Sequence, residues 1–151
     1  MSRPLCLITG ASTGIGAACA VLAAERGYDL VLTYNSDLAG AQAIAAACEA
    51  LGARTQIVQA DVARPEAIDT IFAAVDTLGP LDALINNAGI VGLATRVADL
   101  THGRLRQMFD VNVIGAMLVA AAAVKRMEPR GQGVIINITS AAARLGSANQ
   151  Y

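Results

Sequence analysis

Short apolar runs alternate with helical segments along this chain of 151 residues, at a spacing of about 25–30 residues. The runs with strand composition are Leu5–Thr9, Asp29–Tyr34, Thr55–Ala60, Leu81–Asn86 and Val134–Ile138. The segments with helical character are Ile15–Arg26, Leu38–Leu51, Pro65 to about Leu78, and about Arg104–Met127. Right-handed crossovers between successive strands place such a chain in a parallel sheet with helices on both faces. The pattern therefore predicts a doubly wound α/β fold, as a single domain spanning residues 1–151 whose sheet looks cut off after the fifth strand.

Composition excludes several functional classes. The formal net charge is −1, so the chain lacks the excess positive charge that binds nucleic acid or an anionic membrane. The longest apolar stretch, Val113–Val124, is too short to span a bilayer and reads as a buried helix. The three cysteines form no metal-binding spacing, and the N-terminus does not resemble a signal peptide. We expect a cytoplasmic protein with no metal site and no membrane partner.

The turn between the first strand and the first helix reads "TGASTGIG", Thr9 to Gly16. Glycine lets a backbone turn sharply and approach a pyrophosphate closely, and the N-terminus of the following helix offers N–H groups and a positive dipole end. The residues expected to hold the phosphates are Gly10, Ser12, Thr13, Gly14, Ile15 and Gly16. The alternative is a tight strand-to-helix turn with no ligand. Its position after a strand favours a dinucleotide site in a Rossmann-type sheet.

Five motifs together resemble the short-chain dehydrogenase/reductase family, over the N-terminal part of its fold. They are the glycine turn, Asp61-Val62 after the third strand, "NNAG" at Asn86 to Gly89, Asn112 in "DVNVIG", and "INITS" ending at Ser140. The resemblance implies an oxidoreductase that passes a hydride between a nicotinamide and a small carbonyl or alcohol substrate. It also implies that Asp61 and Val62 contact the adenine, and that Asn87, Ala88 and Gly89 line the cofactor ribose. Read in isolation, Asp61 could equally cap the helix that begins near Pro65.

The end of the second strand distinguishes NADP from NAD. In such folds an acidic residue there bonds the ribose hydroxyls and repels a 2′-phosphate. Tyr34, Asn35 and Ser36 occupy this position and carry no charge, whereas Asp37 is expected in the first turn of the next helix. Asn35, Ser36 and the N–H groups at that helix start could hold a phosphate. We therefore predict NADP as the cofactor, with NAD as the alternative.

The resemblance also assigns chemistry. In this family a tyrosine acts as acid and base, a lysine four residues later lowers its pKa, and a serine orients the substrate oxygen. Ser140 matches the serine, and Asn112 matches a buried asparagine that bends the long helix and holds a water near the lysine. For Ser140 the alternative is a hydroxyl that caps the turn after the fifth strand. For Asn112 it is a satisfied core amide.

The family tyrosine is expected about three positions beyond Tyr151, which would then be a wall of the substrate pocket; direct catalytic use of Tyr151 is the alternative. We expect the intact protein to be longer, and the 151-residue chain alone to be poorly soluble and without dehydrogenase activity. A different class of function is a non-catalytic dinucleotide-binding or regulatory module. A sugar-nucleotide epimerase is disfavoured by the glycine spacing. The alanine-rich helix suggests a homo-oligomer, a tetramer or a dimer.

Overall fold

The computed structural model describes residues 3–145 of the chain, apart from the side chain of residue 143. The strands are β1 (Leu5–Ile8), β2 (Asp29–Tyr34), β3 (Thr55–Gln59), β4 (Leu81–Asn86) and β5 (Val134–Asn137). The helices are α1 (Gly14–Glu25), α2 (Leu38–Ala50), α3 (Pro65–Leu78), η1 (Val97–Asp99), α4 (His102–Phe109), η2 (Asp110–Gly115), α5 (Ala116–Met127), η3 (Glu128–Arg130) and α6 (Ala142–Leu145). Every predicted strand and helix therefore forms, and most ends move by no more than one or two residues.

The strands form one parallel sheet in the order β3-β2-β1-β4-β5. The chain winds outward from β1 to β3 and then crosses to the other side of β1 to add β4 and β5. This reversal lies between β1 and β4, so the connections that follow these two strands lead to opposite faces of the sheet and leave a crevice at their carboxyl ends. The doubly wound Rossmann-type fold predicted from the sequence is thus confirmed.

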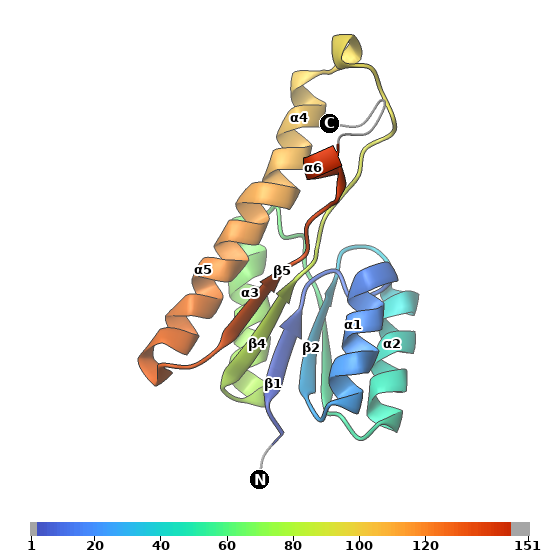
Figure 1. Ribbon diagram of the computed structural model, residues 1–151. Helices are drawn as coiled ribbons and strands as arrows, with labels where there is room; N and C mark the ends of the chain where they lie inside the picture. Colours follow the sequence, from blue (N-terminus) through green and yellow to red (C-terminus); the bar gives the residue numbers. More distant parts are fainter. Residues whose placement is uncertain (1–2, 146–151) are drawn as a thin grey trace.

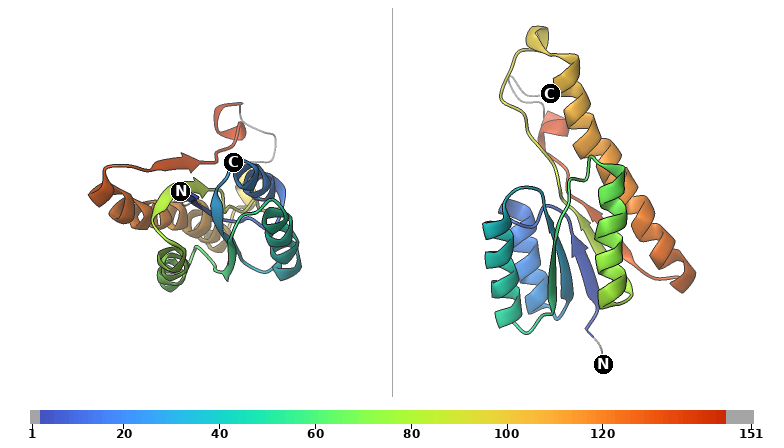
Figure 2. Two further views of the ribbon diagram at one scale, coloured as in Figure 1. Left: turned by 90° about the horizontal axis from the view of Figure 1, so that it is seen from below. Right: turned by 180° about the vertical axis from the view of Figure 1, so that it is seen from behind.

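Alternation along the buried strands divides the core into two layers. Leu5 and Leu7 of β1 face a cluster that includes Phe72 of α3 and Val119 of α5. Cys6 and Ile8, one residue out of phase, face the opposite cluster beneath α1 and α2. Figure 1 shows α1 and α2 on one side of the sheet, and Figure 2 shows α3 beside α5 on the other. Both faces of β1 are buried, as a central parallel strand requires.

The long helix differs from its prediction in start and in shape. It begins at His102, two residues before the predicted start, because the Thr101 side chain accepts a hydrogen bond from the backbone N–H of Arg104 and caps the first turn. Between α4 and α5 the chain forms a π-helix, η2, around Asn112. Such π-turns are frequent at functional sites.

His102–Arg130 forms one continuous helix of 29 residues, long and apolar enough by length and composition alone to cross a membrane. The sequence prediction that the apolar segment is too short to span a bilayer counted only Val113–Val124. The helix that contains this segment is long enough, so the prediction is wrong about helix length. Val119, Ala123 and Met127 are buried against the sheet and α3. Only 17% of the apolar window is buried, so the predicted buried helix is buried along one face and exposed along the rest.

Burial of Cys6 leads to a first prediction. Burial, together with nearby Cys19, raises the pKa of the Cys6 thiol from 9.0 to about 12. Because the unfolded thiol ionises more easily, this group's contribution to stability is complete below about pH 9 and is lost as the pH rises towards 12. We expect iodoacetamide at pH 8 to alkylate Cys6 only on unfolding, and half-buried Cys19 earlier. Peptide mass mapping with and without urea measures this, and native labelling of Cys6 at the rate of Cys19 would contradict it.

Candidate functional site

The glycine turn is shaped so that side chains are excluded from it. Gly10 and Gly14 have φ values of +67° and +58°, which glycine adopts without strain. A β-carbon on Gly16 would lie 2.2 Å from the Gly10 carbonyl oxygen and 2.6 Å from Asn87 Nδ2. Thr13 takes the N-cap position of α1 but makes no side-chain cap bond within the described structure. The turn thus presents backbone at the start of a helix, which is the arrangement that binds phosphates.

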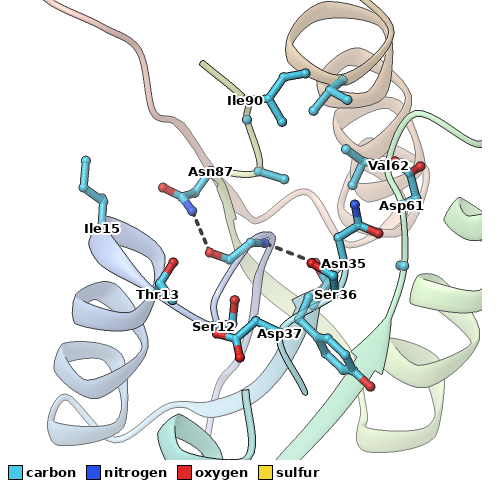
Figure 3. A pocket seen from close by; sticks show the side chains of 17 residues that line it. Ser12, Thr13, Ile15, Asn35, Ser36, Asp37, Asp61, Val62, Asn87 and Ile90 are labelled. Atoms are coloured by element: carbon cyan, nitrogen blue, oxygen red, sulfur yellow. Dashed lines mark hydrogen bonds between the residues drawn. The ribbon is translucent and has the colours of Figure 1, made fainter. Parts of the chain in front are cut away.

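Thr9 fastens this turn to the loop after β4. Its hydroxyl oxygen accepts hydrogen bonds from the backbone N–H groups of Asn87 and Ala88, both at 2.9 Å. The Asn87 side chain donates to the carbonyl oxygens of Thr9 and Gly10, both at 3.0 Å. On the other side, the Gly10 N–H donates to the Thr33 hydroxyl at 3.2 Å. The ends of β1, β2 and β4 are therefore held together around the crevice (Figure 3).

This clamp gives a second prediction. Thr9 is fully buried, so valine would keep its shape while leaving the N–H groups of Asn87 and Ala88 without their acceptor. We expect Thr9→Val to lower the free energy of unfolding by about 2–4 kcal/mol, since each buried unsatisfied group costs about 1–3 kcal/mol. Thr70→Val on the exposed face of α3 is the control and should change it by less than about 0.5 kcal/mol. Urea denaturation measures both, and equal effects would refute the role of Thr9.

A cavity of about 450 Å³ opens beside the turn. It collects most of the residues predicted to bind a dinucleotide: Gly10, Ser12, Thr13, Ile15, Tyr34, Asn35, Ser36, Asp61, Val62, Asn87, Ala88 and Gly89. Thr13 and Ile15 lie on one side of it, and Asp61 and Val62 on the other (Figure 3). Gly14 and Gly16 do not line it; Gly16 instead lets α1 pack against Gly10 and Asn87.

Other lining residues were not predicted from the sequence. They are Thr33, Asp37, Ala60, Ile90 and Val111. Thr33 and Ala60 are neighbours of predicted residues, so their positions could have been extrapolated. Val111 carries no sequence signal, because only packing brings the long helix beside this cavity.

The end of β2 differs from its prediction in one respect. Asp37 is the N-cap of α2, and its carboxylate accepts a hydrogen bond from the Gly40 N–H at 2.9 Å. That N–H group is therefore not available to a phosphate, contrary to the prediction that the helix start is open. A short polar side chain at the N-cap competes with any ligand for these groups. Asp37 also places a carboxylate in the cavity beside Asn35 and Ser36.

Asp61 does not cap α3, so the alternative reading of this residue is wrong. The N-cap position belongs to Arg64, and Asp61 Oδ1 instead accepts a hydrogen bond from the Ala63 N–H at 3.0 Å. This bond closes the turn in which Val62 is buried, with 5% of its surface exposed. The turn fixes a carboxylate and an apolar side chain on one wall of the cavity.

Ser140 lines a second cavity, of about 650 Å³. The two cavities share Ile15 and the loop from Asn87 to Ile90, so they are adjacent. Ser140 follows the end of β5, is exposed, and accepts a hydrogen bond from the Ala142 N–H at 3.2 Å. The turn-capping alternative is thus observed, although the hydroxyl can still donate its proton. Tyr151 lies outside the described residues.

Asn112 is exposed, not buried as predicted, because the π-helix turns its side chain towards the loop after β4. Its Oδ1 accepts from the Ile90 N–H at 2.8 Å, and its Nδ2 donates to the Ile90 carbonyl at 2.9 Å. Both polar atoms of the amide therefore order this loop. Between residues 3 and 145 there is no group of three or more His, Cys, Asp or Glu side chains that could hold a metal ion.

Known proteins share this arrangement. A family model described as short chain dehydrogenase matches residues 4–151. The uncharacterized oxidoreductase YgfF of Escherichia coli is 37% identical over 97% of this chain and 61% of its own length. The chain thus spans about 60% of the length of this curated relative, and about half of the next ones.

Solved structures agree with this similarity. Acetoin dehydrogenase YohF from Salmonella typhimurium superposes with a TM-score of 0.92 at 35% identity, covering 98% of this chain and 59% of that one. A short chain dehydrogenase from Burkholderia cenocepacia, solved in complex with NADP, gives a TM-score of 0.87 at 36% identity, covering 97% and 59%. This chain therefore corresponds to 59% of each of these two longer structures.

Proposed function

Because the chain belongs to the short-chain dehydrogenase family, we propose that it forms the dinucleotide-binding part of an NAD(P)(H)-dependent oxidoreductase. Its substrate is a small carbonyl compound or alcohol, and NADP(H) is the preferred cofactor. The observation that carries this proposal is the glycine turn. Gly10, Ser12 and Thr13 bring the turn to a cavity whose far wall holds Asp61 and Val62. The missing β-carbon of Gly16 lets α1 begin directly against the Gly10 carbonyl, behind that cavity.

The residues present fit a dinucleotide. Ser12, Thr13 and the start of α1 would hold the pyrophosphate through backbone N–H groups and hydroxyls. Asp61 and Val62 would take the adenine, and the loop from Asn87 to Gly89 the nicotinamide-side ribose. When bound, the nicotinamide supplies or accepts the hydride.

The rest of the chemistry concerns this chain's own groups. The Ser140 hydroxyl borders the cavity next to the dinucleotide cavity, where it would donate a hydrogen bond to the substrate oxygen and orient it. Asn112 holds the loop at Ile90 between the two cavities, so it is a positioning residue. The acid and base of the reaction are expected beyond the described residues.

A titration of the full-length protein with NADPH and with NADH tests the proposal. Enhanced nicotinamide fluorescence on binding gives both dissociation constants. We expect NADPH to bind more tightly, because Tyr34, Asn35 and Ser36 place no charge against a 2′-phosphate. The NADP complex of the Burkholderia cenocepacia relative supports binding of a nicotinamide dinucleotide by this fold. If neither nucleotide binds, the proposed function is wrong.

Asp37 allows a sharper prediction about cofactor choice. Its carboxylate lines the cavity near Asn35 and Ser36 while capping α2. Asparagine also caps helices, so Asp37→Asn should keep α2 intact and remove one negative charge. We expect the ratio of NADPH to NADH affinity to rise about 5- to 10-fold, equivalent to about 1 kcal/mol of Coulomb repulsion. An unchanged ratio, measured by the same titrations, would mean that Asp37 does not face the bound ribose.

We also propose that the protein is a cytoplasmic homo-oligomer, a dimer or a tetramer. Apolar side chains stand exposed along the long helix, among them Phe109 at 56% and Met117 at 69%. Exposed apolar residues that are contiguous often belong to interfaces. Light scattering of the full-length protein tests this point, and a monomer at micromolar concentration would contradict it.

A further inference from the structure

The long helix touches the cavity wall at a residue without a side chain. Gly115, the last residue of η2, is buried against the turn that holds Val62. A β-carbon at Gly115 would lie 2.5 Å from the Val62 carbonyl oxygen, 2.9 Å from its carbonyl carbon and 3.0 Å from its Cγ2. Two of these neighbours are backbone atoms, so they cannot be relieved by a rotamer change. Any side chain here must move the helix or the turn.

The same helix reaches the site at two further points. Val111, four residues before Gly115, lines the dinucleotide cavity directly. Asn112 holds the Ile90 backbone through two hydrogen bonds, and Ile90 borders both cavities. The π-turn therefore contacts two parts of the cavity wall: Gly115 packs against Val62, and Asn112 hydrogen-bonds the loop after β4.

We propose that Gly115 is a positioning residue for the dinucleotide site. Its missing side chain lets the helix rest on the Val62 backbone, which sets the separation between the Asp61-Val62 turn and the loop at Ile90. The inference depends on the proposed function, because it assigns the adenine to that turn. A larger residue at position 115 would displace Val62 and weaken binding of the adenine half of the cofactor.

Gly115→Ala in the full-length protein tests the proposal, with Gly103→Ala as the matched control. Gly103 also lies in the long helix, but a β-carbon there would meet no described heavy atom within 4 Å. The probe is 2′,5′-ADP, which carries the adenine half without the nicotinamide, titrated calorimetrically well below the melting temperature of each variant. We expect its dissociation constant to rise threefold or more in Gly115→Ala and less than twofold in Gly103→Ala. A purely structural role would lower the melting temperature without changing this constant.

The outcomes separate this inference from the proposed function. If the unmodified protein binds neither NADPH nor NADH, the proposed function fails. If it binds NADPH and 2′,5′-ADP, and Gly115→Ala changes the dissociation constant for 2′,5′-ADP less than threefold, only this inference is overturned. If Gly115→Ala does not fold, hydrogen exchange of the unmodified protein, with and without 2′,5′-ADP, tests the positioning role instead. In that case 2′,5′-ADP should slow exchange at the amides of residues 113–117 at least threefold, and a smaller change there overturns the proposal.

Discussion

Replacing Gly16 by alanine is expected to raise the dissociation constant for NADPH at least about 100-fold, equivalent to about 2.7 kcal/mol. The added β-carbon would lie 2.2 Å from the Gly10 carbonyl oxygen and 2.6 Å from Asn87 Nδ2. Relief requires α1 to move away from the turn or the turn to move into the cavity. Gly16 is not among the glycines with positive φ, so alanine adds no backbone strain and the clash alone is tested.

Isothermal titration calorimetry with NADPH measures this effect, and circular dichroism checks that the variant stays folded. Overpacking of this kind costs about 1–3 kcal/mol of stability, which a domain of ordinary stability survives. Gly103→Ala serves as the control here too, because its β-carbon would be unobstructed by the described atoms. A folded Gly16→Ala variant that binds NADPH normally would show that the turn does not cradle the phosphates.

Replacing Ser140 by alanine is expected to lower kcat of the full-length enzyme by about 10²–10³, as loss of one hydrogen-bond donor to the reacting oxygen typically does. Ser140 borders the second cavity and does not line the dinucleotide cavity itself. Binding of NADPH should therefore stay within about twofold of normal. The loss should appear in turnover of a carbonyl substrate, followed by NADPH absorbance.

Thr139→Ala is the matched control for Ser140. Thr139 lines the same cavity one residue earlier and carries a hydroxyl as well. Because Ser140 also accepts the Ala142 N–H, thermal unfolding of both variants should be compared. If Ser140→Ala retains full kcat, then the hydroxyl only caps the turn. If the unmodified protein binds NADPH but turns over no carbonyl or alcohol, the non-catalytic dinucleotide module is favoured.

The sequence by itself determined the elements and their order. The bounds of β2, α3 and β4 agree with those predicted, because each is set by local features such as Pro65 at the first turn of α3 and Gly79 at its end. The glycine turn could also be predicted, because Gly10 and Gly14 adopt positive φ values and this need for glycine is local to the turn. Crossover handedness then placed the predicted dinucleotide residues at one edge of the sheet, and most of them line one cavity there.

Only the tertiary structure decided how these residues are engaged. Asn112 pairs with Ile90, which lies 22 residues away, and it is exposed where the sequence suggested a buried amide. The Asp37 carboxylate caps the start of α2, and Gly115 packs against Val62. A pattern of residue types fixes which backbone conformation is favoured, but a polar side chain chooses among several partners of similar energy. That choice depends on which segments packing brings within about 3 Å, and no local rule contains this information.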